Sequence, residues 1–181
     1  MQHLQQILTH AIALAVTAHR GQLDKAGQHY IAHPLRVMQQ MNTLDTQIVA
    51  ILHDTLEDTS VSLIELEHLG LQQYHLDALI ALTKQSNESR FQALKRTLLN
   101  PLACLVKRAD VYDNMNLLRL NRIQAKDLQR YQHYLQIFTI LNDACQYYHL
   151  LGLNTGYKAI DTRFKKSPLA LAMTLMHAIY F

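Results

Sequence analysis

The six residues from His53 to Asp58 combine one imidazole with three carboxylates, in a stretch otherwise rich in isoleucine, valine and leucine. If this stretch is helical, residues four apart share a face, so His53 lies beside Glu57 and Asp54 beside Asp58. Desolvating these groups is costly unless their charge is compensated, and a divalent cation is the natural compensator. Imidazole and carboxylate ligands together favour Mn²⁺, Fe²⁺ or Mg²⁺. The alternative interpretation is that these polar groups simply face water where the helix ends.

Matching ligands occur at two other places in the chain. His33 lies at the expected start of a helix, and Asp110 interrupts an apolar series on a later one. Asn114 follows one turn after Asp110 on the same face, and buried polar groups of this kind require polar partners. Two histidines and two aspartates would leave an octahedral cation with open positions for water or a phosphate oxygen, as in catalytic rather than structural sites.

Apolar residues three and four positions apart predict the helices that must carry these groups. The expected helices cover residues 4–18, 34–42, 46–58, 63–69, 76–82, 88–99, 102–120 and 126–151. Pro34 is expected at the first position of the second helix and Asp45 as the N-cap of the third. Ser62 and Glu65 form a capping box, and Gly70 suits the C′ stop. Because no window alternates like a strand, the chain is expected to be all-α.

The composition excludes general disorder, since 49% of the residues are hydrophobic and 17% are charged. A length of 181 residues fits one domain, which is expected over residues 1–151. After Gly152 the sequence becomes polar and irregular, which marks a C-terminal extension over residues 152–181. Its apolar run over residues 169–181 is too short to span a membrane. This run is expected to form a helix that packs on the domain or in the interface of a homo-oligomer.

The charge distribution and the two cysteines indicate which binding partners and which cellular location to expect. The formal net charge is +3 and the basic residues are scattered, so no nucleic-acid partner is expected. Cys104 and Cys145 lie in apolar helical patterns, and no secretory signal is recognised. We therefore expect two reduced thiols, no disulfide and a cytoplasmic location.

In their order along the chain, these motifs resemble those of the HD-domain phosphohydrolases. The signature is a histidine, then His-Asp followed three residues later by Glu-Asp, then an aspartate. Residues 18–37, residues 51–59, the pair Thr83-Lys84 and residues 107–115 also resemble the hydrolase domain of RelA/SpoT-type proteins and the stand-alone small alarmone hydrolases. The resemblance implies an all-α fold, a single HD-domain helical bundle, with the C-terminal extension added to it.

The same resemblance implies a set of site residues. It implies Mn²⁺, or another divalent metal, held by His33, His53, Asp54 and Asp110. It also implies that Glu57 and Asp58 handle the attacking water. The implied reaction removes the 3′-pyrophosphate of guanosine tetra- or pentaphosphate, giving GDP or GTP and pyrophosphate.

Four further residues are candidates for contact with this guanosine nucleotide. The resemblance implies that Lys25 holds the nucleotide from the loop before His33 and that Asn114 lines the same pocket. Tyr30 is a candidate for stacking on a base, and Lys84 for a phosphate contact. His19 is expected to brace the loop through a side-chain hydrogen bond.

This chain departs from the family pattern at four positions. Where the family loop reads Arg-Lys-Ser-Gly, this chain has Asp24 and Ala26 around Lys25, and Val111 and Asp113 replace an arginine and a histidine. A first alternative is therefore an HD-domain phosphohydrolase acting on another phosphorylated nucleotide. A second is a metal- or nucleotide-binding sensor without turnover, which would have no need of the Glu-Asp pair.

Overall fold

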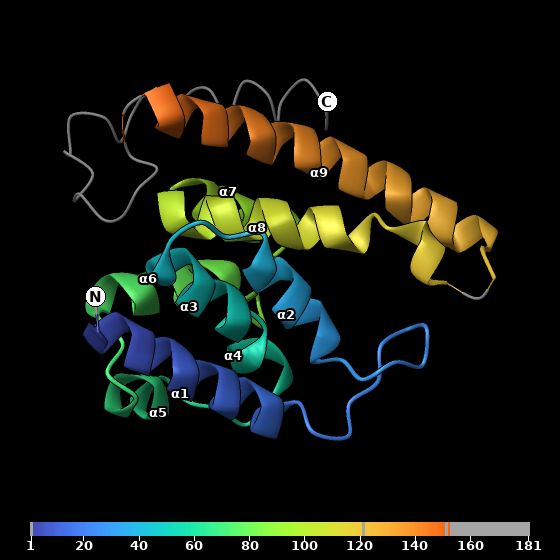
Figure 1. Ribbon diagram of the computed structural model, residues 1–181. Helices are drawn as coiled ribbons and strands as arrows, with labels where there is room; N and C mark the ends of the chain where they lie inside the picture. Colours follow the sequence, from blue (N-terminus) through green and yellow to red (C-terminus); the bar gives the residue numbers. More distant parts are fainter. Residues whose placement is uncertain (1, 121, 151, 153–181) are drawn as a thin grey trace.

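The structure of the protein is a computed structural model that describes residues 2–120, 122–150 and 152. Within them the chain is a bundle of helices (Figure 1). The β-structure of these residues is one isolated bridge between Leu23 and His29. The elements are α1 (Gln2–Ala18), α2 (Ala32–Gln39), α3 (Leu44–Leu52), α4 (Thr55–Asp58), α5 (Leu63–His68), α6 (Gln73–Leu82), α7 (Arg90–Leu98), α8 (Pro101–Asn114), the 3-10 turn η1 (Leu117–Arg119) and α9 (Ala125–Leu150). The all-α prediction is confirmed.

Helix α3 is the central helix of the bundle. Its residues Ile48 to Leu52 are fully buried, and it packs against α1, α2, α6 and α8 in the larger core cluster. A second cluster lies between α7, α8 and α9. Helix α8 contributes to both clusters, with Val106 in the first and Val111 in the second. It therefore lies between α9 and the helices α2 and α3, fixed from two sides (Figure 1).

The prediction of one continuous helix through the His-Asp motif is wrong. Helix α3 ends at Leu52, its C-cap is His53, and α4 begins at Thr55. Side chains form hydrogen bonds with backbone carbonyl oxygens of the last turn of α3. His53 Nδ1 lies 2.7 Å from the oxygen of Ala50, and Thr55 Oγ1 donates to the oxygen of Leu52 at 2.7 Å. This local bonding competes with the continuation of the helix.

Other predicted boundaries also shift. Helix α3 begins under a capping box of Thr43 and Thr46, so Asp45 is not its N-cap. Helix α8 ends at Asn114 and not at residue 120, and the Asn114 side chain donates to the backbone oxygen of Asp110. Pro34 is the third residue of α2, which begins at Ala32.

Several expectations about the rest of the chain are met. The capping box of Ser62 and Glu65 forms, and Gly70 follows α5 with φ of +96°. Cys104 and Cys145 are free thiols, with their sulfur atoms 3.5 Å apart between α8 and α9. No helix among the described residues has both the length and the hydrophobicity to span a membrane. The helix expected over residues 169–181 lies outside the described residues.

Candidate metal centre and its pocket

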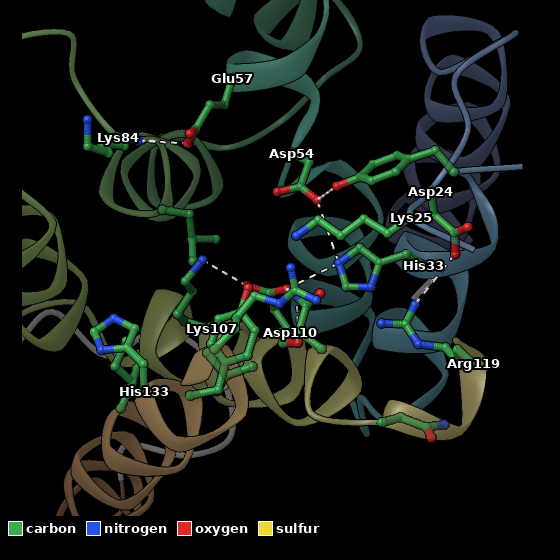
Figure 2. A pocket seen from close by; sticks show the side chains of 18 of the residues that line it. Asp24, Lys25, His33, Asp54, Glu57, Lys84, Lys107, Asp110, Arg119 and His133 are labelled. Carbon is green, nitrogen blue, oxygen red and sulfur yellow. Dashed lines mark hydrogen bonds and ion pairs between the residues drawn. The ribbon is translucent and has the colours of Figure 1, made fainter. Parts of the chain in front are cut away.

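Four predicted ligands converge from three elements. Helix α2 supplies His33, the turn between α3 and α4 supplies His53 and Asp54, and α8 supplies Asp110. His33 Nε2 lies 3.1 Å from Asp110 Oδ1 and 3.7 Å from Asp54 Oδ2. His53 Nε2 lies 2.9 Å from Asp54 Oδ2 and 3.8 Å from Asp110 Oδ1. Figure 2 shows His33, Asp54 and Asp110 pointing toward one another.

The break after α3 brings two adjacent residues to this centre. In a continuous helix, neighbouring side chains point about 100° apart around the axis. In the turn, the side chains of His53 and Asp54 instead approach each other at 2.9 Å. The turn after α3 therefore carries two consecutive candidate ligands whose side chains are in contact.

Both imidazoles have a hydrogen-bond partner at Nδ1. For His53 the partner is a carbonyl oxygen, which can only accept, so Nδ1 carries a proton and Nε2 is the nitrogen left for a metal. That Nε2 atom is buried and has no hydrogen-bond partner among the described residues. His33 Nδ1 lies 2.7 Å from Asp113 Oδ2. Two imidazoles and two carboxylates gathered in one place are the kind of ligands that a divalent cation takes. The buried His53 nitrogen without a hydrogen-bond partner fits this interpretation.

The carboxylates are ionised and have their own partners. Burial would raise the pKa of Asp54, but the charge of His53 lowers it to about 2. Tyr30 donates its hydroxyl to Asp54 Oδ2 at 2.5 Å. Asp110 accepts from Asn114 Nδ2 at 2.6 Å and pairs with Lys107 Nζ at 2.8 Å.

The centre forms one wall of a pocket of about 590 Å³, a volume suited to a small-molecule ligand. All four residues predicted to contact the nucleotide line it: Lys25, Tyr30, Lys84 and Asn114. Sequence reasoning missed further cations on its walls, namely Arg90, Lys107, Arg119 and Arg130. Burial and the charge of Arg130 lower the pKa of Lys25, so cations from distant segments lie near one another.

Two residues of α9, His133 and Tyr134, also line the pocket, although the sequence does not mark them as site residues. Tyr134 packs against the second core cluster as well. Helix α9 therefore forms part of the pocket wall.

The predicted water-handling pair occupies the short helix α4. Glu57 lines the pocket, and its Oε2 accepts from the backbone N–H of Lys84 at 3.0 Å (Figure 2). Asp58 is not among the described residues that line the pocket. Burial and the negative charges of Asp54 and Glu57 raise the pKa of Asp58. The structure thus places Glu57 in the pocket lining. Asp58 follows it in the chain, close enough to Asp54 and Glu57 to feel their negative charge.

The loop between α1 and α2 explains one departure from the family pattern. Asp24 Oδ1 accepts from the backbone N–H groups of Ala26 and Gln28, at 2.8 and 2.9 Å. The carboxylate therefore shapes the loop itself. His19 Nδ1 lies 2.7 Å from Gln22 Oε1, which confirms that it braces the loop.

The described residues form an all-α helical bundle in which two histidines and two aspartates converge. A solved structure, described as a metazoan ortholog of SpoT that hydrolyzes ppGpp and plays a role in starvation responses, has this fold: its TM-score is 0.61 at 19% identity, over 81% of this chain and 96% of that one. No family model matches the sequence.

Curated relatives resemble the chain over part of its length. It is 32% identical over 128 residues to a guanosine-3′,5′-bis(diphosphate) 3′-pyrophosphohydrolase of Aquifex aeolicus, which is 65% of this chain and 18% of the relative. It is 30% identical over 125 residues to a probable GTP pyrophosphokinase of Mycobacterium leprae, 62% of this chain and 16% of the relative. The chain thus spans less than a fifth of these relatives. The resemblance to RelA/SpoT-type proteins is confirmed.

Proposed function

We propose that this protein is an Mn²⁺-dependent phosphohydrolase that removes the 3′-pyrophosphate of guanosine tetra- or pentaphosphate, giving GDP or GTP and pyrophosphate. The observation that carries the proposal is the convergence of two imidazoles and two carboxylates on one wall of a cation-lined pocket. The similarity to a 3′-pyrophosphohydrolase supports the choice of reaction. We assign the catalytic domain to residues 1–151 and the extension to residues 152–181.

The metal would be held by His33, His53, Asp54 and Asp110. A divalent cation there supplies Lewis acidity at a phosphoryl oxygen. The protein's contribution is to hold the four donor groups in place, and Asn114 does so for Asp110 through its amide hydrogen bond. Phosphoryl transfer depends mainly on such positioning and on electrostatic stabilisation.

Glu57 is the residue we assign to the attacking water. The backbone N–H of Lys84 holds one of its carboxylate oxygens, which fixes the side chain at the pocket wall. The other oxygen would accept a proton from water, the role of a general base. Asp58 is assigned as its helper, because a carboxylate with a raised pKa is a stronger base.

The cations of the pocket are assigned to the phosphate groups. A substrate with several phosphates requires several positive charges. They are supplied by Lys25 in the loop between α1 and α2, Lys84 in the segment after α6, and Arg130 on α9. Charge-assisted hydrogen bonds from these groups would stabilise both the bound nucleotide and the charge that develops on the leaving pyrophosphate. Tyr30 lines the same pocket while its hydroxyl holds Asp54.

A second candidate is hydrolysis of a different phosphorylated nucleotide. The specific observation in its favour is the loop, where Asp24 is used to shape the backbone and Ala26 offers no hydroxyl. The contacts that the family pattern places at these two positions are thus absent from the described loop. The metal centre would serve either substrate.

The two candidates separate in one assay. Metal-free protein is incubated with Mn²⁺ and a panel of phosphorylated nucleotides that includes guanosine tetraphosphate, alongside Glu57→Gln and Asp110→Asn. Glu67→Gln is the matched control, because Glu67 is exposed on α5 and lies outside the described pocket lining. We expect Mn²⁺-dependent pyrophosphate release from the tetraphosphate, lost in the two site variants and kept in the control. Turnover of another panel member alone indicates the second candidate, and Mn²⁺ binding without any turnover refutes both.

A further inference from the structure

Asp113 is a buried carboxylate whose two oxygens are both occupied. It lies on α8, three residues after Asp110, and is 7% exposed. Its Oδ2 lies 2.7 Å from His33 Nδ1. Arg36 donates from Nε to Oδ1 at 2.8 Å and from Nη2 to Oδ2 at 3.0 Å. The carboxylate therefore joins a candidate metal ligand to an arginine fork.

The geometry fixes the orientation of the imidazole of His33. A histidine ring without a partner at Nδ1 rotates over a broad range about its last side-chain torsion. A carboxylate at Nδ1 selects the tautomer with the proton on that atom, turns Nε2 into the donor atom and increases its basicity. His33 Nε2 is the atom that lies 3.1 Å from Asp110, on the side of the candidate metal centre. The contact of Asp113 with Nδ1 thus orients Nε2 toward the candidate metal centre.

The arginine fork fixes the carboxylate in turn. A bidentate guanidinium holds a carboxylate in a defined plane, which a single charge does not. Arg36 and His33 lie on α2, whereas Asp113 and Asp110 lie on α8. The same pair of helices therefore supplies two candidate ligands and the clamp that sets their relative position. Arg119 adds positive charge at 3.6 Å from Asp113 Oδ2.

We propose that Asp113, held by Arg36, is a positioning residue that aims His33 at the metal centre, and that the metal affinity of this protein depends on it. The inference rests on the metal centre of the proposed function. A purely structural ion pair between α2 and α8 would need only Arg36 and Asp113. The short contact from Asp113 to His33 is the feature that such a pair leaves unexplained.

The test measures Mn²⁺ binding to metal-free protein, by the electron paramagnetic resonance of free Mn²⁺, for Asp113→Ala and Asp113→Asn. Asp45→Ala is the matched control, because Asp45 forms a comparable contact of 2.8 Å with His75 outside the described pocket lining. We expect Asp113→Ala to raise the Kd about 10- to 100-fold, the usual cost of losing such a partner. Asp113→Asn, which keeps an oxygen acceptor, should give a smaller increase. The control should be less stable to heat and bind Mn²⁺ within twofold of the native protein.

Nitrogen-15 NMR of the metal-free protein supplies a second readout. The His33 imidazole should show one fixed protonation pattern in the native protein and an averaged one in Asp113→Asn, whereas a structural role alone would leave the ring unchanged. If Asp113→Ala does not fold, Asp113→Asn and Arg36→Lys decide the outcome. Native Mn²⁺ affinity in folded Asp113 variants overturns the inference. Failure of the native protein to bind Mn²⁺ refutes instead the metal centre of the proposed function.

Discussion

Replacing His75 should change how the stability of this protein depends on pH. His75 is fully buried on α6, its Nδ1 accepts from the backbone N–H of Gln72, and its Nε2 lies 2.8 Å from Asp45 Oδ1. Because Nδ1 is an acceptor, the proton resides on Nε2 and the ring is neutral. Burial lowers the pKa of His75, with Asp45 acting in the opposite direction. A folded pKa below the unfolded one means that acid favours the unfolded chain.

The magnitude follows from proton linkage. The stability that His75 contributes is complete above the unfolded pKa of about 6.5 and is lost as the pH falls below it. If the folded ring stays neutral throughout, the loss between pH 7.5 and pH 5.5 is at most about 1.4 kcal/mol. Urea unfolding of the metal-free native protein and of His75→Gln at both pH values isolates this contribution, since the other histidines are common to both proteins.

The native advantage over His75→Gln in unfolding free energy should shrink at pH 5.5. The opposite result would refute the reasoning: an advantage that grows in acid would mean that His75 is a charged partner of Asp45. An advantage that is the same at both pH values would mean that the folded and unfolded pKa values are equal.

Three further predictions concern the centre and the second core cluster. Tyr30→Phe removes the hydroxyl that holds Asp54 and should weaken Mn²⁺ binding about tenfold; an unchanged Kd in a Mn²⁺ titration would contradict this. Burial would lower the pKa of His33, but its aspartate partners raise it to about 9. The metal must therefore displace a proton, and the Kd for Mn²⁺ should fall up to tenfold from pH 7 to pH 8. Calorimetry in buffers of different ionisation enthalpy should detect the released proton, and a pH-independent Kd would argue against it. Tyr148→Phe leaves the backbone oxygen of Leu98 unpaired in the core and should cost about 1 kcal/mol in urea unfolding, whereas native stability would show that the hydrogen bond contributes nothing.

The elements that the sequence predicts well are those with regular apolar spacing. Helices α1 and α6 each bury one face or more, and their periodic residues place them within a few positions of the observed bounds. The start of α3 is placed equally well. The end of α3 is different, because it depends on hydrogen bonds from His53 and Thr55 back to their own backbone. Apolar periodicity carries no information about such bonds, so the helix was extended too far.

The candidate ligands were predictable from residue type, but their supporting contacts were not. His33 and Asp110 stand out as polar residues within apolar helices. The role of Asp113 depends on the packing of α2 against α8, two helices far apart in the sequence. In the sequence, Asp113 is only a departure from a family pattern. Lys107 was within reach of sequence reasoning, since it precedes Asp110 by three residues on one helix.

Because of where the four candidate ligands lie in the chain, binding of a metal ion should be coupled to folding. They come from α2, the α3–α4 turn and α8, so the donor atoms are assembled only after these distant segments have packed together. An ion that binds the assembled centre and not the unfolded chain acts as a removable cross-link. At a free concentration one hundred times its Kd, it would add about 2.7 kcal/mol to the unfolding free energy. A chelator should therefore lower the Tm of this protein by an amount that depends on the metal concentration it competes with.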